Sequence, residues 1–139
     1  MEKTLHLFAR SLLTAYASPS LIGVYRAIIN EAFRFPELAR EFYDKGPGLA
    51  AARLKEILDA AGERGEIGPV DTAVAAEQFV SMMRDNLHLQ VVLGLRPPPD
   101  AAEIDRRAAN AALLFLHGIQ PSVPAPVPPR TQRKKSSSP

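Results

Sequence analysis

Apolar side chains recur every three or four residues along most of the chain, and this spacing predicts α-helices. The expected helices cover residues 2–17, 19–34, 37–45, 47–64, 71–93 and 100–117. No segment shows the apolar–polar alternation that is typical of a half-buried strand. The pattern therefore predicts an all-α fold, a helical bundle of five to six helices.

Residues with strong capping preferences stand at the expected helix ends. Ser18 precedes a proline and Asp71 precedes the longest apolar pattern, so both are expected N-caps. Asp100, with Glu103 three residues later, has the spacing of a capping box. Gly94 and the three prolines that follow it predict where the long helix ends.

Residues 71–93 carry two apolar stripes instead of one. Phe79 lies on one stripe and Val80 on the other, and the polar ridge between the stripes is narrow. The helix at 100–117 is similarly two-faced. If one face of each packs within the chain, the others predict a four-helix-bundle interface between two copies, formed by the last two helices. The expected interface residues are Phe79, Met83, Val91, Ala108, Ala112 and Phe115. Alternatively, both helices are central in a monomer.

The chain divides by composition into a helical domain, residues 1–118, and a Pro-rich basic tail, residues 119–139, which we expect to be disordered. Four of the 17 basic residues lie in the tail, which leaves 13 basic against 15 acidic residues in the helical domain. The basic character therefore belongs to the tail, and four bases without interleaved aromatic residues predict only weak, salt-sensitive contact with nucleic acid.

No arrangement of side chains predicts catalysis, a metal site or a cofactor. His6, His88 and His117 are not three or four residues apart, so they cannot form a metal-binding pair on one helix. The sequence has no cysteine, and we expect that it is not an enzyme. With no signal sequence and no apolar run long enough to span a membrane, a cytoplasmic location is expected.

A ligand pocket is the more plausible chemistry. Met82 and Met83 are flexible and polarisable, Tyr25 combines an apolar ring with a polar tip, and Arg84 could bind an anionic or polar group. The expected ligand-binding residues are Tyr25, Ile29, Leu54, Met82, Met83 and Arg84. Ordinary core packing is the alternative interpretation of each of these residues.

The stretch 22–43 reads IGVYRAIINEAFRFPELAREFY, and its specific part runs from Tyr25 to Tyr43. It resembles a stretch in the C-terminal domains of TetR/AcrR-family transcriptional regulators. The junction GPVD at 68–71 and the long helix after it are similar in order and spacing, so the resemblance covers residues 5–118.

This resemblance implies a regulatory domain for transcription, which forms a homodimer and senses a small apolar or amphipathic effector. In the family, a separate N-terminal helix-turn-helix domain reads DNA, and this sequence begins inside what looks like the connecting helix. We therefore expect DNA contact only through such a missing domain, and no contact with a membrane. A structural helical dimerisation module with no ligand is the alternative.

Overall fold

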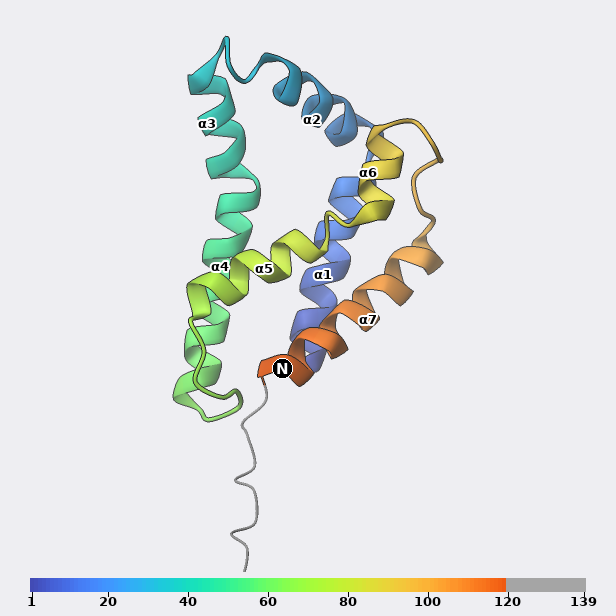
Figure 1. Ribbon diagram of the computed structural model, residues 1–139. Helices are drawn as coiled ribbons and strands as arrows, with labels where there is room; N and C mark the ends of the chain where they lie inside the picture. The colour runs from blue at the N-terminus through green and yellow to red at the C-terminus, as the bar shows by residue number, and fades with distance from the viewer. Residues whose placement is uncertain (120–139) are drawn as a thin grey trace, which may run out of the picture.

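The computed structural model of the protein describes residues 1–119. Within that part it has seven α-helices and no strand, which confirms the predicted all-α fold. The helices are α1 (Glu2–Ala17), α2 (Pro19–Glu31), α3 (Pro36–Lys45), α4 (Pro47–Glu63), α5 (Thr72–Met82), α6 (Asn86–Val92) and α7 (Ala101–Ile119) (Figure 1). Apart from Ile119, the predicted tail lies outside the described residues.

Two pairs of helices share one hydrophobic core. α1 packs along α7, and α4 packs along α5 (Figure 1). Phe79 of α5 connects the pairs, because its ring centroid lies 4.8 Å from that of Phe115 on α7 and 6.4 Å from that of Phe8 on α1. Edge-to-face aromatic pairs of this kind contribute about 0.5–1.5 kcal/mol beyond the burial of their area.

The three N-terminal caps that the sequence predicted are present in the structure. The Ser18 hydroxyl accepts a hydrogen bond from the backbone N–H of Leu21. The Asp71 carboxylate accepts hydrogen bonds from the N–H groups of Ala73 and Val74. The Asp100 carboxylate accepts a hydrogen bond from the N–H of Glu103 at 2.8 Å. The prediction that Glu103 completes the capping box is wrong, because its carboxylate accepts hydrogen bonds from Arg96 and Arg107 instead.

The helix predicted over residues 71–93 is two helices, α5 and α6, separated by a turn at 83–85. The Asp85 carboxylate accepts hydrogen bonds from the N–H groups of Leu87 and His88, at 2.9 and 3.3 Å, and so begins a new helix. Aspartate competes in this way with the backbone bonds of a continuous helix. The single long helix was therefore a wrong prediction, although its end at Gly94, with a φ of 73°, was correct.

The last helix continues two residues beyond the predicted end at His117. Ile119 is buried, and its carbonyl accepts a hydrogen bond of 2.8 Å from the N–H of Gly68, in the α4–α5 loop. Ile119 therefore belongs to the helical domain and not to the tail.

α2 and α3 form an arm that leaves α1 and returns to α4 (Figure 1). α3 has no buried residue, and α2 has only Ile22 and Ile28. Ile22 packs with two residues of α6, and the Arg26 guanidinium donates to the carbonyls of Val91 and Val92, which end that helix. The arm thus packs mainly on α1 and α4, its neighbours in the chain, and these bonds join it to the end of α6.

No single helix among residues 1–119 has the length and apolar composition to cross a membrane. α1 and α2 meet these criteria only as a pair, and the two are bent by 72° relative to each other.

Candidate functional site

Arg84 lies in the turn between α5 and α6, against two tyrosine rings. Its guanidinium carbon is 4.5 Å from the centroid of the Tyr16 ring, on α1, and 5.0 Å from that of the Tyr25 ring, on α2. Both distances are within the range of cation–π attraction. The break that separates α5 from α6 therefore places this cation where the first two helices meet.

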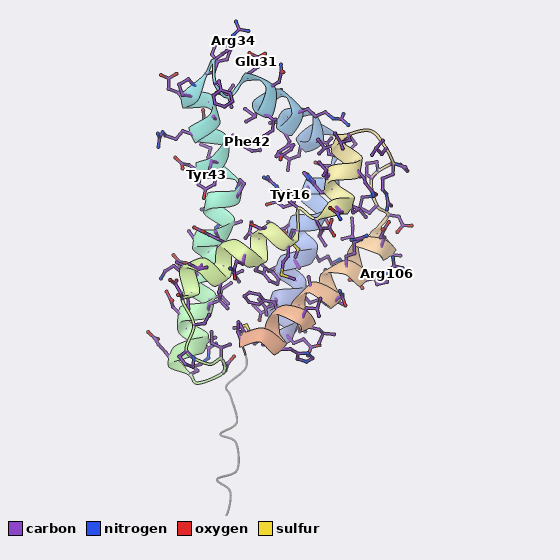
Figure 2. All side chains as sticks on the ribbon, viewed as in Figure 1. Tyr16, Glu31, Arg34, Phe42, Tyr43 and Arg106 are labelled. Atoms are coloured by element: carbon purple, nitrogen blue, oxygen red, sulfur yellow. The ribbon has the colours of Figure 1, made fainter. Side chains whose placement is uncertain are left out.

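Two further rings complete this group. The His88 ring, on α6, lies edge-on to Tyr16 at 5.9 Å and to Tyr25 at 5.2 Å between centroids. The Phe42 ring, on α3, is 6.3 Å from that of Tyr25. Figure 2 shows Phe42 extending from α3 toward the interior, where Tyr16 also lies. We call these five residues the Arg84 cluster: Tyr16, Tyr25, Phe42, Arg84 and His88.

Two buried polar atoms of the Arg84 cluster have no hydrogen-bond partner among residues 1–119: the hydroxyl oxygen of Tyr16 and Nε of Arg84. Tyr16 is only 7% exposed. A buried donor without a partner costs about 1–3 kcal/mol, and more when the group is charged. A group that accepts these hydrogen bonds would therefore stabilise the cluster.

Burial determines the charge of the Arg84 cluster. It raises the pKa of the Tyr16 phenol, and Arg84 opposes this rise through its positive charge and through its polar contact with the phenol oxygen. It lowers the pKa of His88, and Arg84 lowers that pKa further, while Asp85 raises it. Both groups are consequently neutral at pH 7, so the guanidinium is the charged group of the cluster.

A groove of about 620 Å³ lies between the α5–α6 turn and α7. We call it the α7 groove, and its lining combines apolar and charged side chains: Leu13, Met82, Met83, Asp85, Arg106, Arg107, Asn110, Ala111 and Leu114. It opens on a different side of the α5–α6 turn from the rings that surround Arg84, because none of the aromatic residues of the Arg84 cluster lines it.

The sequence predicted six ligand-binding residues: Tyr25, Ile29, Leu54, Met82, Met83 and Arg84. The structure brings Tyr25 and Arg84 together. Leu54 and Met83 are buried in the main core, Ile29 is 61% exposed on α2, and Met82 lines the α7 groove. These four therefore lie outside the Arg84 cluster.

The predicted site omitted three members of the cluster. Tyr16 and Phe42 occur at helical spacing on their own segments, and nothing in that spacing shows that they meet. His88 is brought to the tyrosines by the turn that begins α6, and the prediction of one continuous helix concealed this turn. The signal for this turn in the sequence is Asp85, a residue type that prefers the N-cap position.

The six residues predicted for a dimer interface lie inside the chain: Phe79, Met83, Val91, Ala108, Ala112 and Phe115 are all at most 9% exposed. The two-faced pattern arises because α5 and α7 pack against other helices of the same chain. These residues are core residues in this structure, which corrects the assignment. The apolar side chains that α6 and α7 leave exposed are Leu89, Leu93, Leu113 and Leu114.

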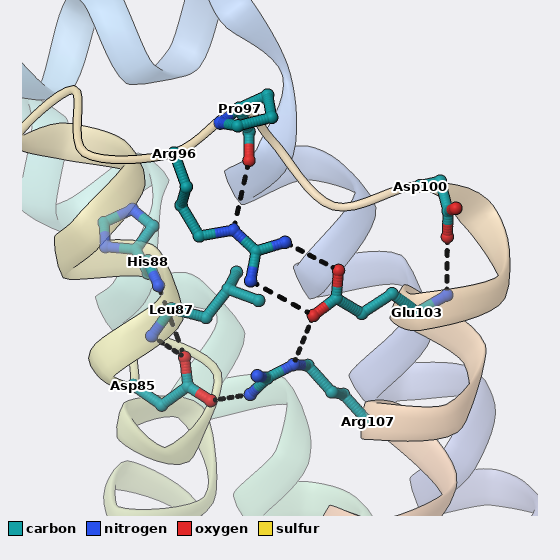
Figure 3. A network of polar contacts seen from close by, with 8 residues as sticks. All are labelled: Asp85, Leu87, His88, Arg96, Pro97, Asp100, Glu103 and Arg107. Atoms are coloured by element: carbon teal, nitrogen blue, oxygen red, sulfur yellow. Dashed lines mark hydrogen bonds and ion pairs between the residues drawn. The ribbon is translucent and has the colours of Figure 1, made fainter.

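Ion pairs fix the start of α6 to α7 (Figure 3). Arg107, on α7, donates to the Asp85 carboxylate at 2.6 Å and to the Glu103 carboxylate at 3.3 Å. Arg96, in the α6–α7 loop, donates to Glu103 at 2.8 Å, and this bond is the main cause of the lowered pKa of Glu103. Asp85, the residue next to Arg84, is thereby bonded to Arg107, which lines the α7 groove.

Within residues 1–119, no group of three or more His, Cys, Asp or Glu side chains could hold a metal ion.

Comparison with known proteins identifies the class of this all-helical domain. Residues 3–118 match the C-terminal domain of AefR-like transcriptional repressors, and the chain belongs to the TetR family of transcriptional regulators. A solved structure, that of "Flavonoid-responsive Regulator FrrA", is similar with a TM-score of 0.76 and 34% sequence identity. The similarity covers 88% of this chain and 62% of FrrA, so the chain spans less than two thirds of that protein. No curated protein sequence matched.

Proposed function

We propose that this domain regulates transcription by binding a small amphipathic effector and by forming a homodimer. Regulators of this family typically bind effectors and act as homodimers. The observation that carries the proposal is the Arg84 cluster, where aromatic rings from four helices surround a cation and two unpartnered polar atoms. Convergent apolar and polar groups are typical of ligand sites. The cavity that Tyr16 and His88 line holds only about 10 Å³, so a ligand can enter only when the cluster opens.

The α2–α3 arm is the route by which an effector reaches the cluster. It contributes two of the five side chains, Tyr25 and Phe42, and its helices have few buried residues. Segments with few buried apolar contacts open at low free-energy cost. We expect the arm to move away from α1 and α6 when an effector enters.

A flavonoid is the first effector to test, because the similar regulator FrrA is described as flavonoid-responsive. We expect the 139-residue chain to bind naringenin saturably in calorimetric titration, with one molecule per chain. Tyr25→Ala removes an aromatic wall of the cluster and should weaken binding about tenfold, which corresponds to about 1.4 kcal/mol.

Tyr43→Ala is the matched control, since Tyr43 is 54% exposed and is not part of the cluster. This variant should bind naringenin as the original chain does. A folded chain that shows no saturable binding would instead support a structural dimerisation module with no ligand. Equal loss of affinity in both tyrosine variants would place the effector elsewhere.

A further inference from the structure

No carboxylate of the described residues neutralises the guanidinium of Arg84. Within residues 1–119, Arg84 makes no ion pair, and the neighbouring carboxylate of Asp85 is fully engaged. One Asp85 oxygen caps α6 and the other accepts from Arg107 at 2.6 Å. The described part of the chain therefore offers no acidic side chain to neutralise this partly buried guanidinium.

We propose that the Arg84 cluster binds the ionised acidic group of a planar aromatic ligand, with Arg84 and Tyr16 donating hydrogen bonds to it. This inference rests on the proposed effector-binding function and names the chemical class of the effector, an aromatic carboxylate or phenolate.

The unpartnered atoms define the acidic part of the ligand. The guanidinium and the phenol ring are in direct contact, so Nε–H of Arg84 and O–H of Tyr16 belong to adjacent groups. Nε–H of Arg84 is a donor, and the Tyr16 hydroxyl can donate its proton while its oxygen faces the guanidinium, so an anionic oxygen is an acceptor that fits both. Hydrogen bonds with ionised groups are roughly twice as strong as neutral ones, which favours an acid over an amide or an alcohol.

The rings define the aromatic part of the ligand. Tyr25 and Phe42 present rings from α2 and α3, and His88 is a neutral ring at this site at pH 7. Neutral aromatic walls suit a planar apolar body, whereas additional charges would favour a polar one. The single cation also matches an acid of one negative charge.

A pair of probes of almost equal shape tests the proposal. At pH 7.5, the 139-residue chain should bind naphthalene-2-carboxylate about tenfold more tightly than the neutral naphthalene-2-carboxamide. Arg84→Gln should abolish this preference, and Tyr16→Phe should reduce it severalfold. Arg40→Gln, at an exposed position of α3, should keep the tenfold preference.

A second measurement does not depend on any variant. The Arg84 Nε–H signal in NMR spectra of the original chain should shift on titration with the carboxylate and not with the amide. Equal affinity for the two probes, binding of neither, or a preference that survives Arg84→Gln would overturn the proposal. If naringenin still binds in that case, the effector function stands and only the acidic class is wrong.

Discussion

At the residue scale, the environment of His88 connects folding to pH. The imidazole is 9% exposed, packs on two tyrosine rings and faces the positive charge of Arg84, while Asp85 supplies the nearby negative charge. Burial is the largest cause of its lowered pKa. Protonation of His88 is therefore less favourable in the folded chain than in the unfolded chain.

We predict that the free energy of unfolding falls as the pH drops below 6.5, the ordinary histidine pKa. In that range the unfolded chain binds a proton at His88 that the folded chain does not, until the pH passes the lower folded pKa. Urea denaturation between about pH 8 and pH 5 measures the effect. His88→Gln should remove this loss, and His117→Gln, at an exposed position, should leave it. Unfolding that is independent of pH over this range would contradict the prediction.

The sequence showed some residues of the site and concealed others for a physical reason. Tyr25 and Arg84 combine polar atoms with a setting of apolar helices, and their chemistry alone made them candidates. Leu54 and Met83 are apolar residues on stripes of the same helical spacing, and they lie in the core. Helical periodicity identifies buried positions, and it does not distinguish a side chain that packs on protein from one that contacts a ligand.

At the scale of elements, capping residues gave correct helix starts, whereas periodicity gave a wrong helix length. The apolar stripes continue across residues 83–85, so the pattern resembles one helix over 71–93. The Asp85 carboxylate accepts two hydrogen bonds from the first turn of a new helix and forms an ion pair with Arg107. These tertiary and capping bonds stabilise the break, and an ion pair with another helix cannot be seen in a local pattern.

Asp85→Ala is expected to destabilise α6 locally, because a helix of seven residues depends on its cap. Loss of the cap should cost about 1 kcal/mol, and loss of the exposed Arg107 pair at most about 1 kcal/mol more. Amide hydrogen exchange should accelerate at Leu87 and His88, whose N–H groups lose their acceptor.

Asp71→Ala is the matched control, since Asp71 caps α5 in the same way without an ion pair in the described residues. It should accelerate exchange at Ala73 and Val74 and leave α6 protected. Unchanged exchange at Leu87 in the Asp85 variant would show that packing alone holds the start of α6.

At the scale of the whole molecule, one element connects the two proposed activities. The α5–α6 turn holds Arg84 against the aromatic rings on one side and Asp85 against Arg107 of α7 on the other. A movement of Arg84 toward a ligand would therefore also move Asp85 and its partner Arg107, which line the α7 groove. The same two-faced burial explains why sequence patterns suggested an interface for residues that form the core.

We predict that a second copy of the chain covers the exposed side of α7, so that Leu114→Glu converts a dimer to a monomer of 15.1 kDa. Leu114 is 60% exposed and lines the α7 groove. A charge placed there would lose its contact with water in the dimer, and should weaken association about thirtyfold or more, as at an interface hot spot. Leu38→Glu, at a position of α3 that is 48% exposed, is the control and should remain dimeric. Light scattering over a range of concentrations distinguishes these outcomes. A monomeric original chain would disprove the homodimer, and a Leu114→Glu dimer of unchanged affinity would place the interface on another face.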